Sequence, residues 1–198
     1  ECWTGFRCHK GGAIGYTGIR PDLSCYAKAM GNGIPVSAIV GNKNLMKNFE
    51  EIFFSFTNAS DGFGLAAADF MISYLDEEFF TKQTKKTYRF LEEIRKLEEK
   101  IDNNDLKIKI TAYPGKVVFS PKNPALSLKI KTYIQKKCLE NGILFNMFMA
   151  ICEDHSEKDF QNFLNLFDSI AIDFNNPSFD IDFETQDCMV KPVFRKQL

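Results

Sequence analysis

Residues 21–35 read PDLSCYAKAMGNGIP and place one amine, Lys28, between two alanines. Gly31-Asn32-Gly33 and Pro35 follow soon after. A lysine that acts as a covalent nucleophile needs surroundings of this kind, because desolvation disfavours the ammonium form, lowers the pKa and leaves the amine able to form an imine. Glycines also let the backbone pass close to a bound group. The stretch therefore predicts a reactive lysine, although a lysine beside a glycine turn is more often an ordinary surface residue.

The residues around this lysine predict two short, buried strands joined by the glycine turn. The strands are expected at 22–28 and 35–41, and the second has β-branched residues and no charge, which is typical of an interior strand. Residues 1–20 are rich in glycine and predict a loop that either is flexible or lines a site. Further along, we expect a short helix over 44–49, a strand end or loop at 53–57, and a small-residue helix over 62–75.

The remainder of the chain has the pattern of a small α+β domain. A long amphipathic helix is predicted over 79–101, where apolar residues recur at three- and four-residue steps with charged residues between them. Ser156, with Asp159 three residues later, indicates a helix start, and Gly142 indicates a helix end. The other predicted elements are strands at 106–112, 116–120 and 143–145, and helices over 126–141 and from 156 to 172.

The composition is that of an ordinary globular protein and disfavours several function classes. The chain has 198 residues and a net charge of -1, which gives no electrostatic reason to expect binding to nucleic acid or to an anionic membrane. Its six cysteines are scattered, so neither a metal site nor a disulfide framework is expected. No apolar run reaches the roughly 18 residues that cross a bilayer. We therefore expect reduced thiols in a cytoplasmic protein.

Four motifs in order give the sequence a strong resemblance to the class III aminotransferases, fold-type I enzymes that use pyridoxal phosphate. The chain is similar in particular to the branch that contains glutamate-1-semialdehyde aminomutase. The resemblance covers residues 1–75 and thins afterwards, with a weaker similarity around 141–157. Its motifs are ECWTGFR at 1–7 with HKGGA at 9–13, GIRPDL at 18–23, KAMGNGIP at 28–35, and FSFT at 54–57 followed by LAAA at 65–68.

The resemblance implies roles for individual residues. Lys28 would form a Schiff base with pyridoxal phosphate and later shuttle a proton at the substrate α-carbon. Thr57 would hydrogen-bond the cofactor phosphate, acting from the neighbouring subunit of a homodimer. Cys2 falls where an apolar residue of the family packs on the pyridine ring. The cofactor would supply the electron sink, and the protein would supply position and electrostatics.

The resemblance also implies an α/β fold in four parts. Residues 1–75 would be the C-terminal part of the pyridoxal-phosphate-binding large domain, which is a three-layer α/β/α structure. Residues 76–105 would form a linking amphipathic helix. Residues 106–175 would be a small C-terminal α+β domain, and 176–198 an irregular tail.

The sequence departs from the family pattern at three places. The chain begins at Glu1 rather than at a methionine, and the family's aspartate that pairs with the pyridine nitrogen would stand immediately before it, so we expect a partial chain. Asn58-Ala59-Ser60-Asp61 stand where the similar branch often has glycines. Ala27 replaces the glycine that usually precedes the lysine.

Three functions remain open from the sequence. The first is transfer of an amino group between an amino acid and a carbonyl acceptor, both small molecules. The second is glutamate-1-semialdehyde 2,1-aminomutase activity, which would use the same lysine and threonine with different substrate groups. The third is a non-catalytic fragment or one half of a split enzyme, because a chain without the pyridine-nitrogen aspartate and half of the pocket would lose most activity.

Overall fold

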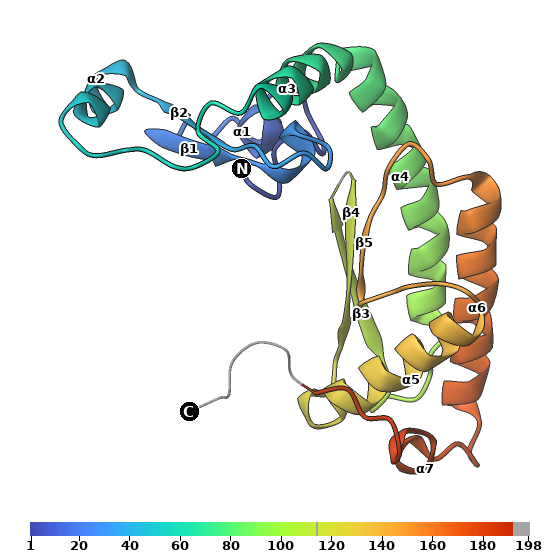
Figure 1. Ribbon diagram of the computed structural model, residues 1–198. Helices are drawn as coiled ribbons and strands as arrows, with labels where there is room; N and C mark the ends of the chain where they lie inside the picture. The colour runs from blue at the N-terminus through green and yellow to red at the C-terminus, as the bar shows by residue number, and fades with distance from the viewer. Residues whose placement is uncertain (114, 192–198) are drawn as a thin grey trace. The chain divides into compact units, whose positions relative to one another are not determined.

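The structure is a computed structural model that describes residues 1–113 and 115–191 (Figure 1). The chain divides into two units, Glu1–Lys85 and Lys86–Leu198. The boundary between them falls inside the long helix α4 (Glu77–Glu99). The four-part division expected from the sequence stays a prediction. Within the described ranges, no helix is both long and apolar enough to span a membrane.

The first unit is built around an antiparallel ribbon of two strands. Strand β1 (Leu23–Tyr26) pairs with β2 (Ala38–Gly41), with Leu23 opposite Gly41 and Tyr26 opposite Ala38. Both strands lie where the sequence predicts them and are shorter. The expectation of a buried, interior second strand is wrong for this chain, because every residue of β2 is half-buried or exposed. A ribbon of two strands cannot cover both of its faces, whatever the β-propensity of its residues.

Short helices surround this ribbon. They are α1 (Gly12–Thr17), the 3-10 helix η1 (Lys28–Met30), α2 (Lys43–Met46), the 3-10 helix η2 (Lys47–Glu50) and α3 (Gly62–Tyr74). Helices α2, η2 and α3 match the sequence prediction, whereas α1 forms inside the expected glycine-rich loop. Side-chain caps set two of the starts: Asn42 Oδ1 accepts the Asn44 N–H at 2.9 Å, and Asp61 Oδ2 accepts the Gly64 N–H at 2.8 Å.

The turn after β1 holds Lys28 in a left-handed backbone conformation, with φ of 55°. The Lys28 carbonyl oxygen accepts the N–H groups of Gly31 and Asn32, each at 3.1 Å. A Cβ on Gly31 would lie 2.2 Å from the Ile34 oxygen, and Gly33 has φ of +105°. The glycines of this turn are therefore needed for folding, because Gly31 allows a close backbone approach and Gly33 adopts a positive φ.

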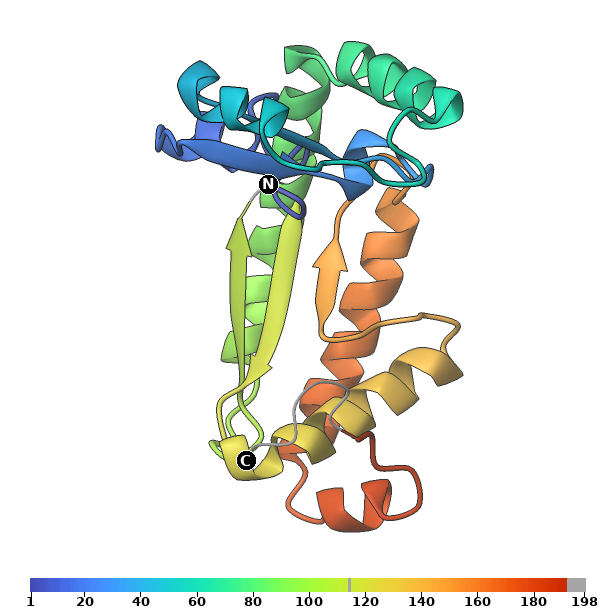
Figure 2. The same cartoon turned by 60° about the vertical axis from the view of Figure 1, so that its left-hand side comes forward.

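The second unit is a three-stranded antiparallel sheet covered by helices on one face (Figures 1 and 2). The strands are β3 (Ile108–Tyr113), β4 (Lys116–Pro121) and β5 (Phe148–Ala150), in the order β3-β4-β5. Helix α4 and helix α6 (Glu157–Asn175) lie against the sheet. The remaining elements are the 3-10 helix η3 (Pro124–Leu126), α5 (Ser127–Glu140) and α7 (Ile181–Thr185).

Phenylalanine forms the centre of the core of this unit. The Phe119 ring of β4 lies 5.1 Å from Phe145, 5.8 Å from Phe163 and 5.3 Å from Phe167, measured between centroids. All four side chains are at most 5% exposed. Burying each ring contributes roughly 1.5–3 kcal/mol, so the contact between α6 and the sheet contributes much of the stability of this unit.

Two sequence predictions for this unit need correction. The strand expected at 143–145 does not form, and β5 begins only at Phe148. Gly142 turns the chain with φ of +72°, and Phe145 is buried as an anchor in the core rather than as a residue of a β-ladder. The tail expected at 176–198 contains α7, whose Ile181 is 8% exposed; residues 192–198 lie outside the described part of the chain.

Position 28 provides a stability prediction. Lys28→Gly should unfold at a higher urea concentration than Lys28→Ala, because alanine retains the strain of the left-handed conformation and glycine does not. We expect the free energies of unfolding to differ by about 1 kcal/mol, measured by the fluorescence of Trp3, the single tryptophan. Equal stabilities would contradict the left-handed geometry of this residue.

The start of α6 provides a second prediction. Ser156 Oγ accepts the Asp159 N–H at 3.2 Å, and the Asp159 carboxylate accepts the Ser156 N–H at 2.7 Å. Ser156→Ala should lower the free energy of unfolding by about 1 kcal/mol. Urea unfolding followed by circular dichroism measures this loss. Ser178→Ala, an exposed serine without a capping role, is the matched control and should leave the stability nearly unchanged.

The same motif predicts a pH dependence. Hydrogen bonds from the Ser156 side chain and backbone hold the pKa of Asp159 below its ordinary value of 3.8. A carboxylate whose pKa is depressed in the folded state stabilises the protein fully above its ordinary pKa, and this contribution disappears as the pH falls through the folded pKa. Asp159→Ala should therefore destabilise the protein at neutral pH and much less in acid. A penalty that does not change with pH would contradict this account.

Candidate functional site

Lys28 is the first residue of η1, and Ala27 alone separates it from β1. Its Nζ lies 5.3 Å from the centroid of the Trp3 ring. This is within the range of a cation–π contact, in which the face of the indole attracts the ammonium. Trp3 is 50% exposed, so the amine and the ring share a surface that a ligand can reach.

Hydrogen bonds to Glu1 hold the segment that carries Trp3. The Glu1 carboxylate accepts the N–H groups of Ala13 at 3.1 Å and Ile14 at 2.9 Å, and also the Thr4 hydroxyl. Burial alone would raise the pKa of Glu1, but the hydrogen bonds from Thr4, Ile14 and Ala13 outweigh burial and hold the pKa below its ordinary value. A charged Glu1 therefore ties residues 1–4 to the start of α1.

The same segment also packs on β1. The rings of Phe6 and Tyr26 lie 5.6 Å apart. A Cβ on Gly5 would lie 2.7 Å from the Glu1 carbonyl oxygen and 2.8 Å from Tyr26 Cδ1, so only glycine fits between them. Because Lys28 follows Tyr26 by two residues, packing on Tyr26 brings the Trp3 segment to the lysine.

The surroundings of Lys28 differ from the sequence expectation in one respect. The lysine is exposed, and residues of this chain do not supply the apolar burial expected around its amine. The amine stays exposed because the two-stranded ribbon has only a few short elements around it in this unit. The contact between Lys28 and Trp3 is the interaction that the sequence did not predict. Twenty-five positions separate the two residues, and no periodicity or spacing in the sequence connects them.

Thr57 lies in an exposed loop before α3. Edge-on ring contacts order the loop: Phe54 lies 4.7 Å from Phe49 and 5.0 Å from Phe56, between centroids. No interaction described within residues 1–113 joins Thr57 to Lys28.

Cys2, the third residue singled out by resemblance, is also exposed. A cavity of about 1050 Å³ lies in the second unit, and none of these three residues lines it.

The family model for class III aminotransferases matches residues 1–146 of this chain. Among curated proteins, the glutamate-1-semialdehyde 2,1-aminomutase of Methanocaldococcus jannaschii is 34% identical over 113 residues, which are 56% of this chain and 26% of that protein. The 3-aminobutyryl-CoA aminotransferase of Cloacimonas acidaminovorans is 27% identical over 165 residues, which are 80% of this chain and 39% of that protein. The chain thus spans well under half the length of these relatives.

Solved structures give the same picture of the fold. An ω-transaminase from Sphaerobacter thermophilus superposes with a TM-score of 0.78 at 15% identity, over 88% of this chain and 43% of the transaminase. A transaminase with pyridoxal phosphate bound superposes with a TM-score of 0.74 at 15% identity, over the same fractions. The chain has the α/β fold of the corresponding part of these enzymes. Because the family model covers most of its length, the chain belongs to the class III aminotransferase family.

Proposed function

We propose that this chain is the lysine-bearing part of a pyridoxal-phosphate-dependent transaminase, which moves an amino group between an amino acid and a small carbonyl compound. One observation carries the proposal: the stretch around Lys28 resembles the lysine motif of the family, and its turn presents the amine at an accessible surface. Backbone strain concentrates at functional sites, and the left-handed conformation of Lys28 is a strain of this kind.

The residues present fit the cofactor. Pyridoxal phosphate carries an aldehyde and a phosphate, and it serves as an electron sink when bound. An exposed lysine amine suits the aldehyde, and the hydroxyl of Thr57 is a donor that suits the phosphate. The indole face of Trp3, beside the amine, suits a flat, conjugated ligand. Lys28 would therefore hold the cofactor covalently, and Thr57 would hold its phosphate.

In this proposal, the chain's own chemical contribution is to move a proton at one atom, the Nζ of Lys28. The Nζ of Lys28 is both the attachment point and the base that takes the proton from the substrate α-carbon. The Trp3 ring lies beside the amine and limits the directions in which the lysine side chain can point.

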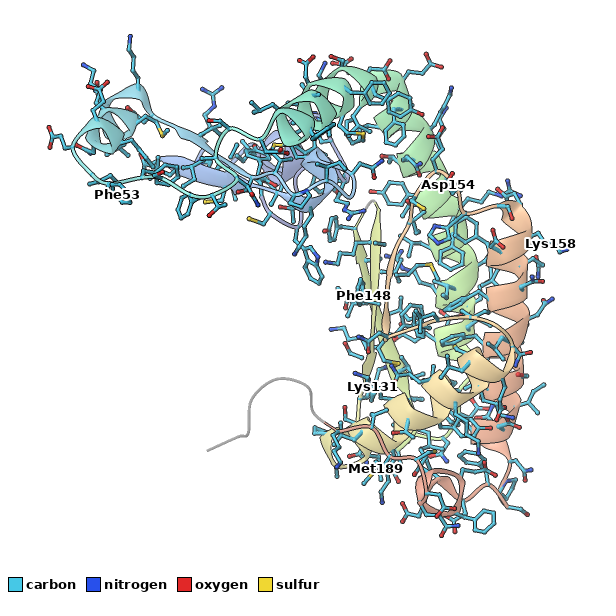
Figure 3. The ribbon with its side chains drawn as sticks, in the orientation of Figure 1. Phe53, Lys131, Phe148, Asp154, Lys158 and Met189 are labelled. Carbon is cyan, nitrogen blue, oxygen red and sulfur yellow. The ribbon has the colours of Figure 1, made fainter. Side chains whose placement is uncertain are left out.

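A homodimer in the cytoplasm is part of this proposal. The segment around Thr57 is unusually apolar for a surface: Phe53 is 96% exposed, Phe56 64% and Phe63 81%. Figure 3 labels Phe53, whose side chain projects from the loop after α2. Exposed apolar patches of this kind mark protein contacts. A second copy of the protein that covers this segment would place Thr57 beside a neighbouring subunit's cofactor.

The second candidate is an aminomutase, which moves an amino group within one molecule. Several curated relatives carry this name, including one from Methanococcus maripaludis that is 31% identical over 157 residues. Both reactions would use the same lysine. A requirement for a separate carbonyl acceptor distinguishes them, since only the transaminase needs one. Activity of the holoprotein with glutamate 1-semialdehyde alone would favour the aminomutase.

Reductive labelling tests the role of Lys28. The chain is incubated with pyridoxal phosphate, reduced with borohydride, digested and analysed by mass spectrometry. We expect the label to concentrate on Lys28, and Lys28→Ala to lose it, whereas Lys43→Ala, which removes another exposed lysine of the same unit, should keep it. A label spread evenly over exposed lysines would count against the proposal.

Thr57 provides a further prediction. Thr57→Ala should weaken pyridoxal phosphate binding by about tenfold, because a hydrogen bond to a charged group contributes roughly 1.5–3 kcal/mol. Ser60→Ala, in the same exposed turn, is the matched control and should bind as the parent chain does. Titration of the cofactor followed by absorbance measures both. Equal affinities of the two variants would remove Thr57 from the site.

A further inference from the structure

A thiol–imidazole pair lies just before α6 in the second unit. Cys152 Sγ lies 3.2 Å from His155 Nδ1. The backbone N–H of Cys152 donates to the same nitrogen at 3.1 Å. Because this N–H needs an acceptor, Nδ1 carries its lone pair and the ring proton is on Nε2. The Cys152 S–H can therefore donate to Nδ1, and His155 is placed to take its proton.

The pair is held in place and is accessible. Cys152 is exposed, and His155 is half-buried. The imidazole lies 5.9 Å from the buried ring of Phe160. Lys86 Nζ donates to the carbonyl oxygens of Cys152 at 3.2 Å and Glu153 at 2.8 Å, which fixes the loop. The thiol thus faces solvent while its proton acceptor is fixed beside it.

Charged residues of both signs lie close to the pair in the sequence, and Figure 3 labels two of them, Asp154 and Lys158. The charged residues are Glu153, Asp154, Glu157 and Asp159, with Lys158 on the first turn of the helix. The Lys86 ammonium is bound to the backbone of the same loop.

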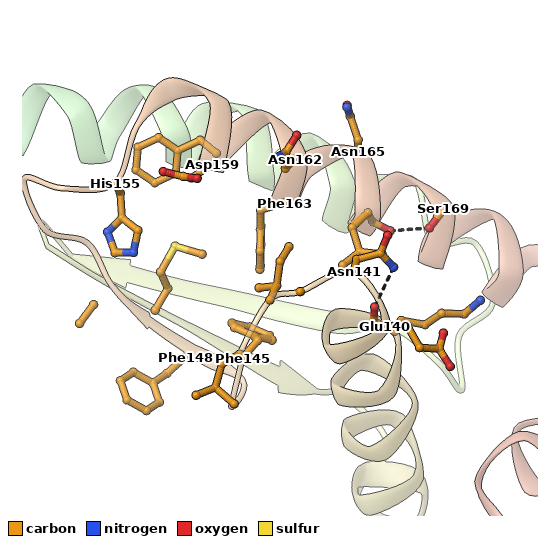
Figure 4. Close-up of a pocket in the computed structure, with 18 residues that line it drawn as sticks. Glu140, Asn141, Phe145, Phe148, His155, Asp159, Asn162, Phe163, Asn165 and Ser169 are labelled. Atoms are coloured by element: carbon orange, nitrogen blue, oxygen red, sulfur yellow. Dashed lines mark hydrogen bonds between the residues drawn. The ribbon is translucent and has the colours of Figure 1, made fainter.

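His155 also lines the cavity of about 1050 Å³ in this unit. Figure 4 shows the cavity between the end of α5, the segment that leads into β5, and α6. Its wall carries polar groups, among them Asn162 and Asn165, together with the apolar rings of Phe145 and Phe163. A space of this size accommodates a small organic molecule. A reagent bound there would lie next to His155, which contacts the Cys152 thiol.

We propose that Cys152 is a modification site that forms mixed disulfides with low-molecular-weight disulfides, with His155 as the base. The Cys152 thiol gives its proton to His155 Nδ1, and the thiolate attacks one sulfur of the disulfide. That S–S bond breaks, and a bond between Cys152 and the attacked sulfur forms. The departing thiolate takes the proton from His155. Cys152 is thereby oxidised, and half of the disulfide is reduced to a thiol.

This inference goes beyond amino-group transfer, because no step assigned to Lys28 or Thr57 uses the pair. The other cysteines lack this arrangement. Burial raises the pKa of Cys138 to about 12, and burial together with the charge of Glu1 raises that of Cys8. The chain has two histidines, and Nδ1 of the other, His9, accepts the Gly11 N–H at 2.9 Å. Cys188, exposed and in the same unit, is therefore a matched control thiol.

The test follows modification of each cysteine with time. The full chain is incubated with glutathione disulfide at neutral pH, quenched in acid, digested and analysed by mass spectrometry. We expect Cys152 to be modified at least about tenfold faster than Cys188, a margin below the roughly 100-fold that a positioned base contributes at the low end. Equal rates at the two cysteines in the unmodified sequence would overturn the proposal without any variant.

His155→Asn isolates the proton transfer. An asparagine Oδ1 can accept the Cys152 N–H in place of Nδ1 but cannot take the thiol proton. The variant should keep the melting temperature and the Cys188 rate while its Cys152 rate falls to that of Cys188. A Cys152 rate unchanged in this variant would show that the imidazole is only structural, and would also overturn the proposal.

Discussion

The carbonyl oxygen of Lys28 accepts two backbone N–H groups, from Gly31 and Asn32, in a turn where the Lys28 backbone is left-handed. The turn fixes where the lysine amine emerges from the ribbon. Glycine at position 31 is needed for the same turn, since a Cβ would meet the Ile34 carbonyl oxygen. The residues that close this turn therefore also determine where the Lys28 amine lies.

The interaction between Lys28 and Trp3 depends on a chain of contacts that begins at Glu1. The Glu1 carboxylate fastens its own segment to the start of α1, and Gly5 and Phe6 pack on Tyr26. Each contact is local and modest, but together they bring residue 3 to residue 28. The second unit is stabilised differently, by a cluster of phenylalanine rings between α6 and the sheet, and the thiol–imidazole pair lies at the start of that same helix.

Local signals in the sequence predicted much of this fold. The periodicity of α4 and the capping box of α6 follow from residues close together in the chain, and β3 and β4 lie near the ranges predicted for them. The failures concern longer-range packing. Residues 143–145 have the apolar character of a strand, yet they form no strand, and the Phe145 side chain is buried in the core. A reactive lysine at position 28 was predicted from the residues beside it. The contact of Lys28 with Trp3 and the contact of Cys152 with His155 became visible only in the structure. Whether Thr57 acts at the site depends on a second copy, which a single sequence does not place.

The most direct test of the central claim uses the fluorescence of the single tryptophan. If the amine of Lys28 lies against Trp3, a pyridoxyl group reduced onto that amine lies within a few ångströms of the indole and should quench its emission almost completely. We expect strong quenching in the purified, reduced adduct and emission close to that of the unlabelled chain when Lys28→Ala is treated in the same way. Bright tryptophan emission from an adduct shown by mass spectrometry to carry the group on Lys28 would contradict the geometry described for this site.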